Sequence, residues 1–279
     1  MGKLDGKVAI VTGVASKKGI GHAIALRLAQ EGANLAINDI PLAGVRPDWQ
    51  GLKDIEVEIK ALGQRALVIE GDITSSQHVD EMVAKCVDEL GKVDILVNNA
   101  GIAGPTGTRL VDFPENIWDK IMMVNLKGTF LCSKAIAKRM LAIGEGGKII
   151  NIASFLGKRP DVGWGPYSVS KFGVVGLTQN LALELAKDRI CVNAVCPGVV
   201  ETEIVDTWVE EEIKRASSKG IGAEEATTKA YKYLNNRAPL RRMAQPDDIA
   251  NVVVFLASSE SDYMTGQAIN VTGGLLMSH

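Results

Sequence analysis

The chain has 279 residues, 46% hydrophobic and 23% charged, so it can bury a sizeable core beneath a charged surface. Its 31 basic and 33 acidic residues leave a net charge of -2, which gives no positive field for a nucleic-acid backbone, and we expect no nucleic-acid partner. No apolar run approaches the ~20 residues that span a bilayer and the first residues lack the apolar core of a signal peptide, so we expect no membrane partner and a cytoplasmic location.

Short apolar runs alternate with longer helical patterns along the whole chain. This alternation is typical of repeated βαβ units, and runs that are almost continuous in Val, Ile, Leu and Ala indicate strands covered on both faces. Because no Pro/Gly/Ser-rich linker or internal repeat interrupts the pattern, we predict a single α/β domain over 1–279, doubly wound around a mostly parallel sheet. The predicted strands are 7–12, 35–38, 66–70, 94–97, 148–153, 190–196 and 268–271.

A glycine-rich turn follows the first predicted strand and leads into a helical pattern that starts at His22. Glycines such as Gly13 and Gly21 let the backbone turn tightly and bring a pyrophosphate close to a helix N-terminus, whose dipole favours anions. The next predicted strand ends in Asp39, 18 positions after Gly21, where a carboxylate can accept hydrogen bonds from an adenosine ribose. The pattern predicts a dinucleotide site, with an ordinary glycine turn and a turn aspartate as the alternatives.

Three of the helical patterns have recognisable starts. Ser75 or Ser76 can cap a helix that runs to about Leu90. Pro114 and Pro246 sit where first-turn prolines are tolerated, so each predicts the start of a helix.

Tyr167 and Lys171 lie four residues apart in a helical stretch, which places the phenol and the ammonium on one face. A free tyrosine titrates near ~10, and lowering its pKa by ~3 units takes about 4 kcal/mol. A unit charge ~4 Å away at an effective dielectric of ~20 supplies about that amount. The spacing therefore favours a tyrosine that works as an acid and base near neutral pH, although such pairs are also common on ordinary helix surfaces.

One segment, 203–236, departs from the alternation because it is helical in character, rich in Glu and Lys, and lies between the sixth and seventh predicted strands. In a doubly wound sheet, ligands bind outside the carboxyl ends of the strands. A segment that leaves the sixth strand there is placed to act as a lid. The alternative is a solvated pair of surface helices.

The cysteines and histidines are scattered along the chain. The cysteines show no Cys-x-x-Cys spacing and the histidines lie far apart, so we predict no metal site and reduced thiols that serve as small core residues. The residues concerned are Cys86, Cys132, Cys191, Cys196, His22, His78 and His279.

Several motifs occur at predicted strand ends in a fixed order. They are Thr12-Gly13 with Gly19-Ile20-Gly21, Asn98-Asn99-Ala100-Gly101, Ser154, Tyr167-x-x-x-Lys171 and Pro197-Gly198. In these motifs the chain resembles the short-chain dehydrogenase/reductase family over essentially its whole length. The resemblance implies a Rossmann fold with a seven-stranded sheet in the order 3-2-1-4-5-6-7, hydride transfer between a nicotinamide cofactor and a CH–OH donor, and a homotetramer assembled through the helices that carry Asn125 and Tyr167.

The resemblance also implies a role for each matching residue. Tyr167 resembles the general acid/base, and Lys171 the partner that lowers its pKa and binds the nicotinamide ribose. Ser154 resembles the hydroxyl that polarises the carbonyl group, and Asn125 the asparagine that holds a water in the proton relay. The implied cofactor-binding residues are Gly13, Gly19, Ile20, Gly21, Asp39, Asp72, Ile73, Asn99, Ala100, Gly101, Tyr167, Lys171, Pro197, Gly198, Val200 and Thr202.

The glycine loop departs from the family pattern, because five residues, 14–18, separate the first two motif glycines where three are usual. We expect the loop to bulge, since loop-closure entropy grows slowly with length. A basic residue at the position of Lys18 often accompanies NADP in this family, whereas the carboxylate of Asp39 would repel a 2′-phosphate. We predict NAD as the cofactor.

The substrate is expected to be small. Phe155 and Leu156 follow Ser154, Trp164 precedes Tyr167, and Trp208 lies in the predicted lid, which together make a partly aromatic wall. The lid, the 238–242 segment and Asp39 resemble the polyol, sugar and acetoin dehydrogenases of the family, and we predict a polyol or vicinal hydroxyketone.

Three alternatives stay open. Lys158 and Arg159 could recruit an anionic substrate, although exposed basic pairs usually face solvent. A 3-oxoacyl thioester reductase would need a basic surface near the entrance of its active site and would usually prefer NADPH. Asp39 argues against NADPH. A non-catalytic nucleotide sensor is disfavoured because Tyr167 and Lys171 are both present.

Overall fold

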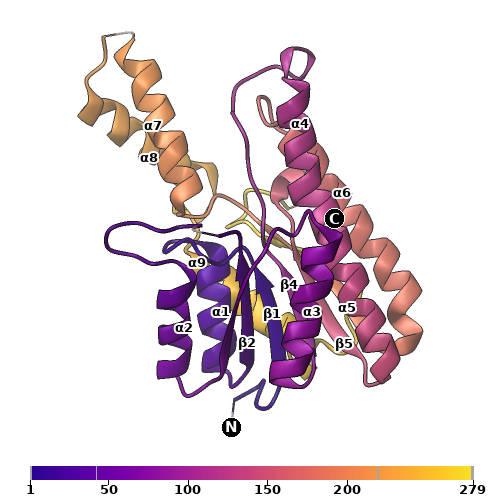
Figure 1. The fold of residues 1–279 in the computed structure, drawn as a ribbon. Coiled ribbons are helices and arrows are strands. Elements are labelled where there is room, and N and C mark those ends of the chain that lie inside the picture. Colours follow the sequence, from indigo (N-terminus) through magenta and orange to yellow (C-terminus); the bar gives the residue numbers. More distant parts are fainter. Residues whose placement is uncertain (1, 42, 219, 278–279) are drawn as a thin grey trace.

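The computed structural model describes residues 2–41, 43–218 and 220–277. Its centre is one seven-stranded sheet in the order β3-β2-β1-β4-β5-β6-β7, and every neighbouring pair of strands is parallel (Figure 1). The strands are β1 Val8–Thr12, β2 Asn34–Asp39, β3 Ala66–Glu70, β4 Ile95–Asn98, β5 Gly147–Ile152, β6 Ile190–Pro197 and β7 Ala268–Val271. The predicted α/β architecture and strand order are therefore confirmed.

The strands form where the sequence is almost continuously apolar. All five residues of β1 and all four of β4 are buried, as expected for strands that helices cover on both faces. The central sheet is consequently the core of the molecule, and polar or glycine-rich residues begin where each strand ends at its carboxyl edge.

Helices cover the sheet in two layers. The layer of α1, α2 and α9 packs on one face, where Ile24, Ile55 and Val253 join the same hydrophobic cluster. The layer of α3, α5 and α6 packs on the other, in a cluster that includes Met82 and Ile136 (Figure 1). These helices are α1 Ile20–Gln30, α2 Leu52–Ala61, α3 Ser76–Leu90, α5 Thr129–Ile143, α6 Gly165–Leu185 and α9 Pro246–Ala257.

The predicted helix starts are close to the observed ones. Ser75 is the cap of α3, where its hydroxyl accepts the His78 N–H at 3.3 Å. Pro246 occupies the first turn of α9, as predicted. Pro114 is the residue just before α4 (Glu115–Met122), one position earlier than a first-turn proline.

The segment predicted as a lid forms two helices, α7 (Glu203–Ser217) and α8 (Ala223–Arg237). They extend beyond the carboxyl ends of the strands as a separate projection (Figure 1). The two helices pack on each other through a small cluster of their own, which includes Val205, Val209 and Leu234. This projection stands at the sheet edge where β6 ends.

Within the described ranges, no helix is long and apolar enough to cross a membrane. The same residues contain no group of three or more His, Cys, Asp or Glu side chains that could hold a metal ion. All four cysteines are free thiols, and three of them are buried. His279 lies outside the described residues.

Candidate active site

A cleft of about 880 Å³ opens at the carboxyl edge of the sheet. Its walls come from the loops that follow the strands, together with α6 and α7. Every residue expected to bind the cofactor lines this cleft, and so do Ser154 and the four expected substrate contacts, Phe155, Leu156, Trp164 and Trp208. The structure therefore brings together in one cavity residues that are separated by up to 195 positions in the sequence. Of the expected site residues, only Asn125 lies outside the lining of the cleft.

The motif glycines allow two loops to touch backbone to backbone. Gly13 has a φ of +69°, and a Cβ built on it would lie 2.5 Å from the Cα of Ala100. A Cβ on Gly21 would lie 2.3 Å from the carbonyl oxygen of Gly13. The side-chain amide of Asn99 stabilises this contact, because it donates to the carbonyl oxygens of Thr12 at 3.0 Å and Gly13 at 2.7 Å. The result is a side-chain-free cradle at the start of α1, a shape that fits a pyrophosphate group.

The enlarged glycine loop does not bulge as a unit into solvent. Its first residues, Val14 and Ala15, are completely buried, whereas Lys17 and Lys18 are exposed. The extra length is thus divided between an inward-packed half and a solvated half.

Asp39 ends β2 at the opposite side of this loop. Its two carboxylate oxygens accept the backbone N–H groups of Ala15 and Ile40, each at 2.9 Å. Burial raises the pKa of Asp39 above its ordinary value, while the two N–H groups act in the opposite direction. Lys18 is directed elsewhere: its Nζ pairs with Asp206 Oδ2 at 3.2 Å, an interaction that raises the lysine pKa, and it does not line the cleft.

The three expected catalytic side chains meet at the other end of the cleft. Ser154 follows β5, Tyr167 is in the first turn of α6, and Lys171 lies one turn later. The Ser154 hydroxyl lies near enough to the Tyr167 phenol to favour its ionised form. The Lys171 Nζ donates to the Ile152 carbonyl oxygen at 2.8 Å and lies 5.6 Å from the centroid of the Tyr167 ring.

The electrostatics of this group differ from the sequence expectation. Burial raises the pKa of Tyr167 to about 12, and the Ser154 hydroxyl only partly offsets it. Burial also lowers the pKa of Lys171 to about 8. The predicted lowering of the tyrosine pKa by the lysine is therefore not found, because the cost of desolvating the phenolate outweighs the attraction of an ammonium group that is itself desolvated.

Asn125 connects the elements around this group. It lies in a short π-helical turn, Met123–Gly128, that joins α4 to α5, and its side chain is completely buried. Its Oδ1 accepts the Ile102 N–H at 2.8 Å, and its Nδ2 donates to the Ile102 carbonyl oxygen and to Ser170 Oγ at 2.9 and 3.0 Å. The side chain thus ties the loop after β4 to the helix that carries Tyr167, and π-turns of this kind are frequent at functional sites.

Comparison with known proteins covers nearly the whole chain. The family model described as enoyl-(acyl carrier protein) reductase matches residues 13–276. A short-chain dehydrogenase/reductase of Armillaria gallica is 41% identical over 272 residues, covering 98% of this chain and 97% of that protein. This chain belongs to the short-chain dehydrogenase/reductase family. It is accordingly an oxidoreductase that acts on CH–OH donors.

Two further similar proteins are a reductase and a dehydrogenase of different named substrates. A diacetyl reductase, (S)-acetoin forming, from Staphylococcus epidermidis is 37% identical over 270 residues, covering 97% of this chain and 98% of that one. The crystal structure of carveol dehydrogenase from Mycobacterium avium in complex with NAD has a TM-score of 0.88 at 31% identity and covers 100% of both chains.

The substrate end of this family member contains residues that the sequence analysis missed. Arg237, at the end of α8, pairs through Nη2 with Asp161 Oδ2 at 2.7 Å. Its guanidinium carbon lies 5.6 Å from the ring centroid of Phe155 and 5.9 Å from that of Tyr233. Asp161, Tyr233 and Arg237 all line the cleft. The only signals in the sequence were the place of Tyr233 in the predicted lid, of Arg237 directly after it and of Asp161 in the run before Tyr167.

The aromatic wall is assembled from both sides of the cleft. Trp164 packs edge-on against Tyr167, with ring centroids 5.8 Å apart, and Trp208 stacks on Tyr233 at 6.1 Å. The basic pair considered as an anion site is not part of this wall. Lys158 donates to the Ala268 carbonyl oxygen and the Asn270 side chain, each at 3.2 Å, and neither it nor the adjacent arginine lines the cleft.

Proposed function

We propose that this short-chain dehydrogenase/reductase interconverts a small secondary alcohol and its carbonyl compound by hydride transfer with NAD. The observation that carries the proposal is the meeting of Ser154, Tyr167 and Lys171 in the same cleft that has the glycine cradle and Asp39 at its other end. A cofactor that spans the cleft from cradle to catalytic group would bring its nicotinamide to the phenol.

The residues act as follows in the oxidation of an alcohol. Tyr167, as phenolate, takes the hydroxyl proton of the substrate, and reduction reverses this transfer. Ser154 donates a hydrogen bond to the substrate oxygen as negative charge develops there. Lys171 holds the ribose hydroxyls and passes the proton onward, with Asn125 positioning a water of the relay. NAD, when bound, supplies the nicotinamide carbon that exchanges the hydride and, in its oxidised form, a positive charge that favours the phenolate.

The choice of NAD over NADP rests on Asp39. Its carboxylate lines the cleft at the end of β2, where adenosine ribose hydroxyls can donate to it and where a 2′-phosphate would meet a negative charge. The basic residue that could have favoured NADP, Lys18, is paired with Asp206. The similar carveol dehydrogenase was solved with NAD, which agrees with this choice.

A small substrate is supported by the lining of the cleft beside Tyr167. Phe155, Trp164 and Trp208 add large aromatic side chains to that part of the wall, and the same cleft of about 880 Å³ must also hold the cofactor. Thr106, Asp161 and Arg237 give the lining hydrogen-bonding groups for a second hydroxyl or keto oxygen. We therefore propose a polyol or vicinal hydroxyketone as the substrate, with the α7–α8 pair as the lid that covers it.

A substrate panel tests this proposal directly. Purified protein is given polyols, sugars, hydroxyketones, bulky steroid alcohols and 3-oxoacyl thioesters, each with NAD(H) and NADP(H), and nicotinamide absorbance is followed. We expect the highest kcat/KM for a small vicinal diol or hydroxyketone with NAD(H). Efficient turnover of steroid alcohols or thioesters alone would refute the substrate class, and cofactor binding without any turnover would favour a nucleotide sensor.

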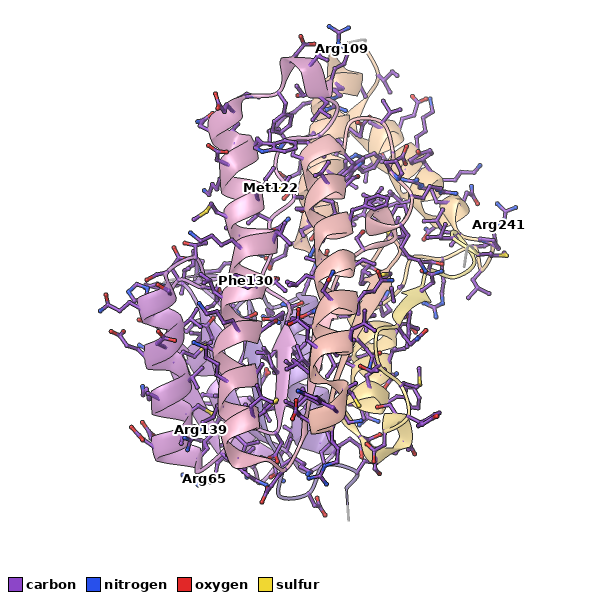
Figure 2. All side chains as sticks on the ribbon, turned by 90° about the vertical axis from the view of Figure 1, so that its right-hand side faces the viewer. Arg65, Arg109, Met122, Phe130, Arg139 and Arg241 are labelled. Carbon is purple, nitrogen blue, oxygen red and sulfur yellow. The ribbon has the colours of Figure 1, made fainter. Side chains whose placement is uncertain are left out.

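We also propose that the chain forms a homotetramer through the α4–α5 and α6 helices. Figure 2 shows Met122, at the end of α4, and Phe130, at the start of α5, along one continuous stretch of helix. The two residues line an open hollow of about 580 Å³ with Leu126 and Leu177. Phe130 is 42% exposed and Phe172 43% exposed. Such a concentration of large apolar side chains suits burial against a second copy of the chain.

A further inference from the structure

The segment 43–51, between β2 and α2, lies against the enlarged glycine loop. Within it, Arg46 and Trp49 close a tight turn through two backbone hydrogen bonds of 2.7 and 3.1 Å. The turn directs the Trp49 side chain inward, where it is only 5% exposed and joins the same hydrophobic cluster as Ala15. A tryptophan is thereby buried directly beside the loop that forms the cradle.

Ala15 is held from two sides. The indole N–H of Trp49 donates to the Ala15 carbonyl oxygen at 2.8 Å, and the Ala15 N–H donates to Asp39 Oδ2 at 2.9 Å. Ala15 is completely buried, and among the described residues only the Trp49 indole donates to its carbonyl oxygen. A chain of two hydrogen bonds therefore runs from the indole through one peptide residue to the carboxylate in the cleft.

Other contacts between the segment and the loop fix the same geometry. A Cβ on Gly44, whose φ is +69°, would lie 2.2 Å from the Ala15 carbonyl oxygen, so the backbone of the segment rests directly on the loop. Lys17 Nζ lies 5.5 Å from the centroid of the Trp49 ring and pairs with Asp48 Oδ2 at 3.1 Å. The loop is thus held at both its buried and its exposed half.

We propose that Trp49 is a positioning residue for cofactor binding: through Ala15 it holds the glycine cradle and the Asp39 carboxylate in the arrangement that receives the pyrophosphate and the adenosine ribose. This inference rests on the proposed use of NAD. The expected catalytic side chains stand just after β5 and on α6, away from this chain of contacts, so Trp49 acts on the binding of the cofactor and leaves the hydride-transfer step unchanged.

The test is Trp49→Phe, which keeps a six-membered aromatic ring at this buried position but removes the indole N–H donor together with the fused pyrrole ring. The Ala15 carbonyl oxygen then stays buried without a partner, a state that proteins avoid, and the loop relaxes away from its binding geometry. We expect the Kd of NAD, measured by calorimetric titration, and the KM for NAD each to rise about tenfold. The kcat at saturating NAD should stay within about twofold of the wild-type value, since no catalytic contact changes.

Two further variants make the result decisive. Trp118→Phe, on α4 and outside the cleft lining, is the matched control and should leave the Kd unchanged. Gly44→Ala disturbs the same Ala15 carbonyl from the backbone side and should weaken NAD binding even if Trp49→Phe fails to fold. A wild-type Kd for NAD in folded Trp49→Phe and Gly44→Ala would overturn this inference and leave the proposed function standing. A fall in kcat with an unchanged KM for NAD would have the same consequence. A wild-type protein that binds no NAD would refute the proposed function, and the inference with it.

Discussion

Replacement of Asp39 by Asn tests the cofactor assignment with little change in shape. Asparagine removes the negative charge and keeps one side-chain oxygen that can accept a backbone N–H, the role that Asp39 has toward Ala15 and Ile40. We expect kcat/KM to fall with NAD, which loses a charged acceptor for its ribose hydroxyls, and to rise with NADP, which loses a repulsive neighbour.

The size of the effect follows from the position of the carboxylate. Two unit charges ~4 Å apart at an effective dielectric of ~20 interact by about 4 kcal/mol. Asp39 is only partly buried, so solvent and salt reduce this to about 1–2 kcal/mol. The ratio of kcat/KM for NADP to that for NAD should therefore rise about 5- to 30-fold. Because burial raises the pKa of Asp39, the wild-type discrimination should weaken as the pH falls and the carboxylate is protonated.

The assay is steady-state kinetics with both cofactors on the wild type and on three variants. Asp39→Ala also releases the Ala15 N–H, so it should lose more NAD activity than Asp39→Asn. Lys18→Met is the control for the competing assignment and should leave the cofactor ratio unchanged, because that lysine is paired with Asp206. A wild type that prefers NADP, with Lys18→Met reversing the preference, would refute this reasoning.

The remaining predictions concern catalysis, pH and assembly. Tyr167→Phe should bind NAD normally but lose turnover about 10²–10⁴-fold, since it lacks the proton donor; single-turnover rates near the wild-type value would contradict the mechanism. Lys171→Met should lose turnover and NAD affinity together. An unchanged Kd for NAD would show that the lysine does not bind the ribose. Because the pKa of Lys171 is about 8, NAD affinity of the wild type should decline above that pH as the ammonium loses its proton, and titrations of Lys171→Met should show no such decline. If the chain forms the proposed tetramer, Phe130→Glu should convert it into smaller species in light scattering, and an unchanged mass would place the interface elsewhere.

The fold could be predicted closely because burial on both faces leaves a strong pattern. Each observed strand begins and ends within one residue of its predicted limits, as in β3, where 66–70 coincides with Ala66–Glu70. The sequence left two positions for the start of α3, since Ser75 and Ser76 can both cap a helix. The structure assigns the role to Ser75, whose hydroxyl reaches His78 N–H.

The cofactor half of the site was predictable for a different physical reason. Its glycines and Asp39 follow strands, and the carboxyl ends of parallel strands meet at one edge of the sheet, so local motifs are brought together by the topology alone. The substrate half depends on how the lid packs back on the body. The pair Arg237–Asp161 joins residues 76 positions apart, and no local pattern in either segment indicates the other.

The environment of Tyr167, the proposed general acid and base, could not be predicted from spacing either. Four residues along a helix place Lys171 beside Tyr167, but the energetic result depends on burial, which spacing does not report. The lysine ammonium is directed to the Ile152 carbonyl oxygen, and both groups are desolvated enough for burial to determine their pKa values.

The case of Lys18 shows how position in a motif and contact in the fold can support opposite conclusions. By sequence it stands next to the second motif glycine, where a basic residue suggests a phosphate ligand and NADP. In the fold it pairs with Asp206 on α7, 188 residues away, and Arg46 pairs likewise with Glu203 at 2.9 Å. Exposed ion pairs of this kind add little stability, so their effect is geometric: they join the lid to the two segments that surround the adenosine end of the cleft. Because that lysine is engaged in the contact, we propose that Asp39 is the charge that decides between the two cofactors.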